Sequence, residues 1–459
     1  MTPPTSTSTP LVMGRIWALL WGALGWGVSA SFAGAAPLSL NDLLDRVDTT
    51  SAELQEHDAK IDEAQALLDQ VLGSSGPSFS MRLFAGPTSK ARGDQVTSPD
   101  SQWRLSGLSD WEGLDFSVIQ PLAGFGRFEA YKRAAEANIV MEEAAKEVKR
   151  AELRQQVRAL YFGAWVARDI TVLLQESLDR VEKAIGIVED ALDEGNEDFS
   201  SVDLLKLKSG KGKIDGFMPQ AKAAQLMAVE ALRGLLRLGP NETVELPNYP
   251  IQAPSLPADA LAVLQSRALE QRPEMQQVAA GLAATQALSD AEQANGRPVA
   301  ALALVGSAAH AGNRSRIDNP FINDPFNHLY GTVLVALQWE INMGVHDAKV
   351  AQAQAKAAQV AAKERFARTG IPLQVMQAYY ETLQYNETVK GFRDAYKAGN
   401  QWLVAAYADF EMGVGQAKEV FDALSEYTLN RVAYLQAVYA LQLSTGRLVQ
   451  AVGGDKDDR

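Results

Sequence analysis

Residues 128–194 read FEAYKRAAEANIVMEEAAKEVKRAELRQQVRALYFGAWVARDITVLLQESLDRVEKAIGIVEDALDE. The stretch contains no proline and only two glycines, so nothing in it ends a helix before Gly195. At 1.5 Å per residue, we expect a single helix of roughly 100 Å. Residues 345–412 have the same character, and an offset of 218 residues places Gly195 on Gly413. The chain is therefore internally duplicated, and this repeat sets the fold.

The N-terminus has the architecture of a secretory signal peptide, residues 1–35. Arg15 precedes the apolar run 16–28, and small residues follow at 33–35. A single membrane anchor is the alternative, but the apolar core is short for one. No later segment offers 20 consecutive apolar residues, which argues against a helical membrane protein. We expect an exported chain that is cleaved near Ala35.

Composition excludes several functions. The 459 residues carry a formal net charge of −13, which argues against nucleic acid as a partner, because neutralising phosphates needs clustered Lys and Arg. The chain has no cysteine, hence no disulfide and no lipid-modified cysteine. Its histidines are scattered, so their spacing forms neither a catalytic triad nor a metal site; they are His57, His310, His328 and His346. We expect no enzyme activity, no cofactor and no metal.

Each half contains the same order of elements. The first repeat, 36–240, has helices at 38–47 and 51–72, a hairpin at 78–121, the long helix at 128–194 and a return helix at 199–238. After a linker at 241–256, the second repeat, 257–459, has helices at 257–271 and 274–294, a hairpin at 299–340, a long helix at 345–412 and a return helix at 416–452. In each repeat two shorter helices sum to about the length of the long one. We expect them to lie end to end beside it.

The two hairpins predict four β-strands. In the first, residues 78–85 and 114–121 alternate between apolar and polar side chains, and a polar loop, 86–110, separates them. Strands of about ten residues match those that cross an outer membrane. Four strands cannot close a barrel, and an open edge in lipid leaves backbone groups unpaired, so several chains must share one barrel. The alternative is two soluble hairpins that pack on the helices.

Small residues recur at heptad spacing in the second long helix, which predicts close coiled-coil packing; they are Ala348, Ala351, Ala355, Ala358 and Ala362. Two places resist the helical pattern. The glycine-rich segment 209–219 interrupts the first return helix, and Pro372 removes a backbone donor from the second long helix. We expect local distortion at both.

This order of elements resembles the outer-membrane efflux family typified by TolC. The resemblance covers nearly all of the mature chain, and two features are the most telling. Gln120 to Arg127, with Pro121 and Gly126, looks like the strand-to-helix corner of the family, and Gly344 is its counterpart in the second repeat. Gly195 and Gly413 look like its helix-turn tips. The resemblance implies a homotrimer in which three chains share a twelve-stranded β-barrel in the outer membrane and an α-barrel across the periplasm.

The same resemblance implies a passive duct of a tripartite efflux or type I secretion system in a Gram-negative bacterium. Its partners would be outer-membrane lipid, a periplasmic adaptor and an inner-membrane transporter. Two other classes stay open, namely a stand-alone trimeric porin and a periplasmic coiled-coil scaffold. The sequence does not distinguish drugs, metal ions and polypeptides as cargo.

Candidate site residues lie at the tips. Glu419 and Asp422 follow Gly413 by six and nine residues, and an i, i+3 spacing puts both carboxylates on one helix face. The resemblance implies that they line the periplasmic aperture, whereas the alternative is an ordinary solvated face. It also implies adaptor contacts at Gly195 and Gly413. The latch positions of the family hold Phe410 and Gly415, so its arginine is not carried over.

An acidic run surrounds the first tip. It consists of Glu189, Asp190, Asp193, Glu194, Glu197 and Asp198. Such a run is either a solvated surface or an entrance that favours cations and meets a basic or polar partner.

Overall fold

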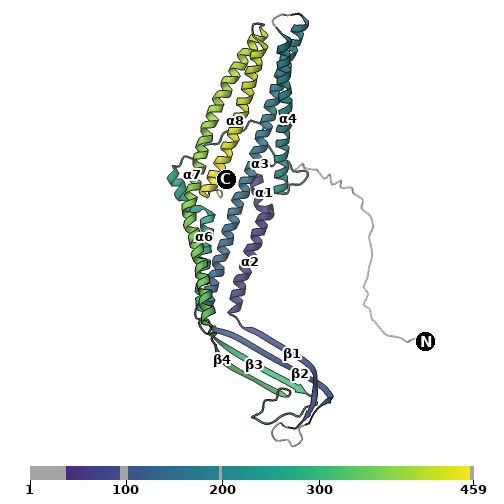
Figure 1. Ribbon diagram of the computed structural model, residues 1–459, viewed down its shortest axis with the longest axis vertical. Coiled ribbons are helices and arrows are strands. Elements are labelled where there is room, and N and C mark those ends of the chain that lie inside the picture. The colour runs from purple at the N-terminus through teal and green to yellow at the C-terminus, as the bar shows by residue number, and fades with distance from the viewer. Residues whose placement is uncertain (1–37, 94–101, 196–198, 455–459) are drawn as a thin grey trace, which may run out of the picture.

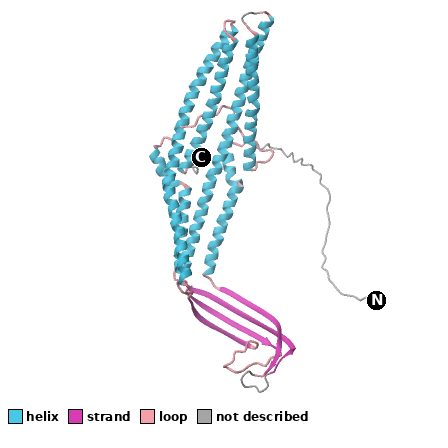
Figure 2. Ribbon diagram, viewed as in Figure 1, coloured by secondary structure: helices cyan, strands magenta, loops and turns pink. Residues whose placement is uncertain are grey.

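The computed structural model describes residues 38–93, 102–195 and 199–454. It is elongated, with helices along most of its length and one sheet at the end (Figures 1 and 2). The helices are α1 (Leu40–Thr50), α2 (Ala52–Ser74), α3 (Arg127–Asp193), α4 (Ser201–Leu236), α5 (Leu261–Gln271), α6 (Pro273–Ala294), α7 (Met343–Glu411) and α8 (Ala417–Val452). The strands are β1 (Ser78–Arg92), β2 (Gln102–Ala123), β3 (Val299–Ala311) and β4 (His328–Gln338). The predicted class, mainly α with a small β part, is confirmed, while the expected signal peptide lies outside the described residues.

Two very long helices organise the body. α3 has 67 residues and α7 has 69. α2 and α4 both pack along α3, and α6 and α8 both pack along α7, as the helix lengths predicted. α6 and α8 also contact α3, and these contacts join the two repeats.

Short polar side chains cap the N-termini of α1 and α4. Ser39 accepts from the backbone amide of Asp42, and the Asp42 carboxylate accepts from Ser39 in return. The hydroxyl and the backbone amide of Ser39 both donate to the Asp42 carboxylate and so lower the pKa of Asp42. Ser200 and Asp203 form the same capping box at the start of α4. Each box satisfies amides that the first turn of a helix leaves without partners.

The largest core cluster lies at mid-length, where α1, α3, α4 and α8 meet the linker between the repeats. The hydroxyl of Tyr161 donates to the carbonyl of Glu245 over 3.0 Å, and the indole of Trp165 donates to the carbonyl of Tyr249 over 3.0 Å. Burial raises the pKa of Tyr161. The buried rings of Tyr161 and Trp165, together with the hydrogen bonds of their polar atoms, hold the linker across α3.

The four strands form one antiparallel sheet in the order β1-β2-β3-β4. One face is apolar and uncovered; Phe79 is 75% exposed and Leu329 is 84% exposed. The other face holds polar residues from neighbouring strands, among them Arg82, Asp115 and Ser307, which the register aligns in one row. Within the described residues, no further strand pairs with the outer edge of β1 or β4, and the edge of β1 carries one isolated bridge, between Ala91 and Arg314.

The first hairpin corrects the sequence-based prediction. The segment 86–110, expected to be a polar loop, is mostly strand, because β1 runs to Arg92 and β2 begins at Gln102. Apolar alternation marks only the part of a strand that has a buried or lipid-facing side. Backbone pairing continues beyond it, as Lys90 opposite Arg104 shows, after a shift of register that follows Thr88.

The alanine stripe of α7 is a second correction. Ala348, Ala351, Ala355, Ala358 and Ala362 are all exposed. Val350 and Val360, on the opposite side of the helix, are half-buried, and Val360 lies near α6 at Gly281. The heptad pattern was correctly detected, but the seam does not lie in the core of this chain.

Neither of the two sites where distortion was expected, the segment 209–219 and Pro372, interrupts its helix. α4 is continuous through 209–219, with Pro219 inside it, and α7 is continuous through Pro372. The carbonyl of Pro372 accepts a hydrogen bond from the side-chain amide of Gln265 on α5 over 3.0 Å. Packing against neighbouring elements thus outweighs the local preference of these residues.

Alanine substitutions at two glycines of the segment 209–219 should have opposite effects on stability. A Cβ at Gly210 would lie 2.1 Å from the Phe421 ring of α8, whereas a Cβ at Gly212 would meet open space. Gly210→Ala should destabilise the chain by about 1–3 kcal/mol through overpacking. Gly212→Ala should stabilise it by about 0.5–1 kcal/mol by reducing the entropy of the unfolded chain. Thermal unfolding followed by circular dichroism measures both, and equal shifts in Tm would contradict the close approach of α4 and α8.

Candidate functional site

Both helix-turn tips depend on left-handed glycines. Gly195 has a φ of +74° and Gly413 a φ of +75°, a conformation that side chains with a Cβ disfavour. A Cβ at either position would contact nothing, so only the backbone requires glycine there. Each glycine thus forms the turn between a long helix and its return helix.

Gly415 has a different reason to be glycine. Its amide and that of Val414 both donate to the carbonyl of Asp409, over 2.9 and 3.1 Å. A Cβ at Gly415 would lie 2.7 Å from the backbone nitrogen of Phe410. This tight turn accounts for the absence of a long side chain at the position where the family has a latch residue, and nothing in the sequence pattern revealed it.

Three contacts join the two tips of the chain. Phe410 is only 2% exposed and meets the Phe199 ring edge-on, with 5.5 Å between centroids. Lys183 of α3 pairs with Glu411 of α7 over 2.6 Å. The Tyr407 hydroxyl donates to the carbonyl of Arg180, and burial raises its pKa. These contacts hold α3 and α4 against α7 and α8 at this end.

The carboxylates of the second tip point away from that core. Glu419 and Asp422 are both exposed, while Val420 and Ala423 beside them are buried. Glu426, one turn further, is also exposed and extends the same line, a residue that the sequence analysis missed. The structure thus brings the predicted pair onto one uncovered face at the start of α8.

The acidic run at the first tip is partly paired. Glu189 pairs with Lys208 across α3 and α4 over 2.7 Å. Asp190, Asp193 and Glu194 are exposed. Residues 197 and 198 of the run lie outside the described part of the chain.

The strand-to-helix corners of the two repeats differ. Gly126 precedes α3 with a φ of +95°, and Phe125 before it has a φ of +46°, which is uncommon for a residue with a side chain. Arg297 donates to the carbonyl of Phe125 over 2.7 Å and so ties this corner to the start of β3. Gly344, by contrast, lies inside the first turn of α7. Pro121 is in β2, beside an irregularity in its pairing with β3.

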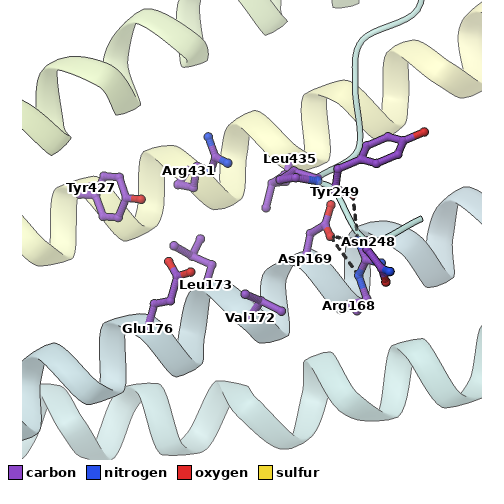
Figure 3. A pocket seen from close by; sticks show the side chains of 11 residues that line it. Arg168, Asp169, Val172, Leu173, Glu176, Asn248, Tyr249, Tyr427, Arg431 and Leu435 are labelled. Carbon is purple, nitrogen blue, oxygen red and sulfur yellow. Dashed lines mark hydrogen bonds and ion pairs between the residues drawn. The ribbon is translucent and has the colours of Figure 1, made fainter. Parts of the chain in front are cut away.

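A groove of about 380 Å³ lies between α3 and α8 beneath the linker (Figure 3). Its most buried charge is Asp169, which pairs with Arg168 over 2.5 Å and accepts from the amide of Ile251 over 2.7 Å. Arg168 also donates to the carbonyl of Tyr249 over 3.0 Å. The groove therefore satisfies these two charges internally, and they anchor the linker.

No helix among residues 38–93, 102–195 and 199–454 is long and apolar enough to cross a bilayer. Within the same ranges, no cluster of three or more His, Asp or Glu could hold a metal ion.

Comparisons with known proteins agree with this architecture. Residues 264–454 match the family model described as outer membrane efflux protein. No curated protein matches the sequence significantly.

Solved outer-membrane channels share the fold. OprN superposes with a TM-score of 0.75 at 20% identity, over 90% of this chain and 90% of OprN. CmeC of Campylobacter jejuni gives 0.74 at 14% identity, over 90% of this chain and 85% of CmeC. MtrE of Neisseria gonorrhoeae, in its open state, gives 0.72 at 17% identity, over 90% of this chain and 89% of MtrE. The resemblance found in the sequence is confirmed: the chain has the fold of solved outer-membrane channels, and its residues 264–454 match the outer membrane efflux protein family.

Proposed function

We propose that this chain is the outer-membrane channel-tunnel of a tripartite efflux or type I secretion system. It would be a passive duct without catalysis, with its sheet in the outer membrane of a Gram-negative bacterium and its helices in the periplasm. The observation that carries the proposal is the four-stranded sheet. It has one uncovered apolar face, one polar face and two edges without a partner strand, and it continues into helices about 100 Å long.

The apolar face fits lipid. Its exposed side chains come from both edge strands, at alternate positions; they are Phe79, Met81 and Leu83 of β1 and Leu329, Val333, Val335 and Leu337 of β4. An apolar face of this extent is unfavourable in water and favourable in a bilayer. Alternation between a lipid face and a polar lumen is what a membrane-spanning barrel strand requires.

The free surfaces of the chain support a ring of identical copies. One side of the sheet ends in β1 and the other in β4. α2, which leads into β1, and α7, which continues from β4, are likewise largely exposed. Two different surfaces of one chain would then meet head to tail, and such contacts form a ring when the rotation between copies closes. The alanine stripe of α7 would allow α2 of the next copy to approach closely, and the resemblance to the family supports three copies.

At the far end, the tips would form the periplasmic aperture and meet the adaptor, which links the duct to an inner-membrane transporter. Three copies would place six carboxylates from Glu419 and Asp422 around one axis. Glu426 would add a third carboxylate from each copy. A ring of like charges in a narrow passage attracts multivalent cations. A stand-alone porin would have the same barrel but would make no adaptor contact at the tips.

The tip glycines generate the first prediction of the proposed function. Gly413→Val forces a β-branched residue into a left-handed conformation, at a cost of about 1–3 kcal/mol, whereas Gly413→Asn is tolerated better there. We expect the Val variant to lose most of its crosslinking to the adaptor and most of its export, and the Asn variant to keep both. Trimer formation should be unchanged in both variants. Equal crosslinking and export in the two variants would show that the turn geometry does not matter for adaptor contact.

The aperture generates the second prediction and tests the proposed function. In planar bilayers the purified protein should form cation-selective pores that trivalent ions block from the periplasmic side. Replacing Glu419 and Asp422 by Ala should weaken this block by about tenfold or more, because each lost charge removes on the order of 1 kcal/mol of attraction.

The matched control replaces Asp62 and Glu63, two exposed carboxylates of α2, and removes the same charge. The control should keep the block of the wild type. If the double variant at the tip is blocked as strongly as the wild type, these residues do not line the aperture. If the protein forms no pores at all, the channel function itself is wrong.

A further inference from the structure

The loop between β3 and β4, residues 312–327, lies at the end of the sheet far from the helices (Figure 1). We call it the outer loop. Trp111 belongs to the polar face, because it alternates with Gly113 and Asp115 along β2. Phe326 of the outer loop packs on Trp111, with 5.2 Å between ring centroids. The outer loop therefore lies on the side of the sheet that faces the lumen in the proposed barrel.

A stack of four side chains joins the sheet to the outer loop. Phe84 of β1 packs on Trp111 at 4.9 Å, Trp111 packs on Phe326, and the guanidinium of Arg314 lies 3.7 Å above the Phe326 ring. Gly113 makes room for this stack, since a Cβ there would lie 2.2 Å from the Phe84 ring. Aromatic and cation–π contacts of this kind favour one fixed position of the outer loop.

The far end of the first hairpin holds the same segment by backbone contacts. Arg314 donates through Nε to the carbonyl of Ser89 over 3.0 Å, and the amide of Ser315 donates to the carbonyl of Ala91 over 3.1 Å. Asn313 donates to the carbonyls of Thr88 and Gly107, over 3.2 and 2.5 Å. Both strands of the first hairpin thus contact the outer loop.

Asp324 shapes the outer loop from inside. Asp324 is only 7% exposed. Its carboxylate accepts hydrogen bonds from the backbone amides of Ile317, Phe326 and Asn327, over 3.1, 2.9 and 3.2 Å. A carboxylate that accepts several amide hydrogen bonds orders the backbone around it. The carbonyl of Asp324 also contacts Nδ1 of His328 at 3.0 Å.

His328 in turn connects the outer loop to the sheet. Its Nε2 lies 2.7 Å from the Ser307 hydroxyl, which donates to Asp115 over 2.7 Å. The polar row of the sheet and the base of the outer loop are therefore one hydrogen-bonded network.

Another part of the outer loop is not anchored. Phe321 is 94% exposed, and Arg316 is exposed and, among the described residues, pairs only with Asp318 of the same loop, over 3.2 Å. The outer loop thus contains an arginine and a phenylalanine that hold it and another of each that do not. This pairing supplies matched controls.

We propose that the outer loop is a constriction at the outer mouth of the duct, and that Arg314 and Phe326 determine the size of solute that passes. The proposal rests on the channel function, because only ring closure brings the outer loops of all copies around one axis. Each outer loop then occupies part of the lumen cross-section, at the opposite end from the tips. The duct would have two narrow places, and the outer one is held by contacts within each copy.

The test uses the absence of cysteine in the chain. Ser80→Cys places a single thiol on the polar face of β1, between the outer loop and the helices. Intact cells are treated from outside with a small methanethiosulfonate reagent and, separately, with a bulky polyethylene glycol maleimide. Labelling rates are measured alone and together with Arg314→Ala and Phe326→Ala, and with the controls Arg316→Ala and Phe321→Ala.

The small reagent should label the thiol in every variant. The bulky reagent should react at least about tenfold faster in the Arg314 and Phe326 variants, since losing a charged hydrogen bond or a stacked aromatic ring weakens the closed position by that order. The two controls should keep the wild-type rate. Equal bulky labelling in all variants, fast or slow, would overturn the constriction while small-reagent labelling leaves the channel standing. Failure of the small reagent in every variant would overturn the channel and the constriction together.

Discussion

A backbone amide or carbonyl inside a bilayer has no water to bond with, so every one of them needs a partner in the protein. The sheet of this chain does not meet that condition alone. β1 and β4 each have an edge without a partner strand in the described chain, on a sheet whose apolar face suits lipid. Each unsatisfied group in lipid costs several kcal/mol. In the proposed ring, a neighbouring copy on each side would remove this cost, so the sheet would need assembly for stable insertion.

The helices follow from the same constraint. In the proposed ring the copies would stand around one axis, and the layer of helices would have to close around that axis as well. α7 exposes a stripe of alanines opposite the side that packs on α6. Small side chains at heptad positions leave room for a helix of another copy. Within one copy, the linker, the large core cluster and the contacts between the tips make α3 and α7 one body that can carry this surface.

Much of the fold was predictable because the pattern is local. Long proline-poor stretches gave the helices, the repeat gave their order, and glycines at the reversals gave the left-handed turns at Gly195 and Gly413. The polar halves of β1 and β2 were missed, because pairing such as Lys90 with Arg104 leaves no apolar alternation. Contacts such as Lys183 with Glu411 join residues 228 positions apart and depend on how the helices pack. Within the hairpin predicted at 299–340, the fixed position of the outer loop could not be predicted, since its anchors come from three different strands.

The head-to-tail ring is tested most directly by disulfides between copies. A cysteine replaces Thr332 in β4, and a second replaces Ser78, Ser80 or Arg82 in β1, one at a time. Within one chain these strands are three strand spacings apart, roughly 14 Å, too far for a disulfide. Oxidation in isolated outer membranes should give covalent dimers and trimers, and nothing larger, for at least one of the three pairs. Monomers alone for every pair, or a ladder that extends beyond three chains, would contradict a closed ring of three copies.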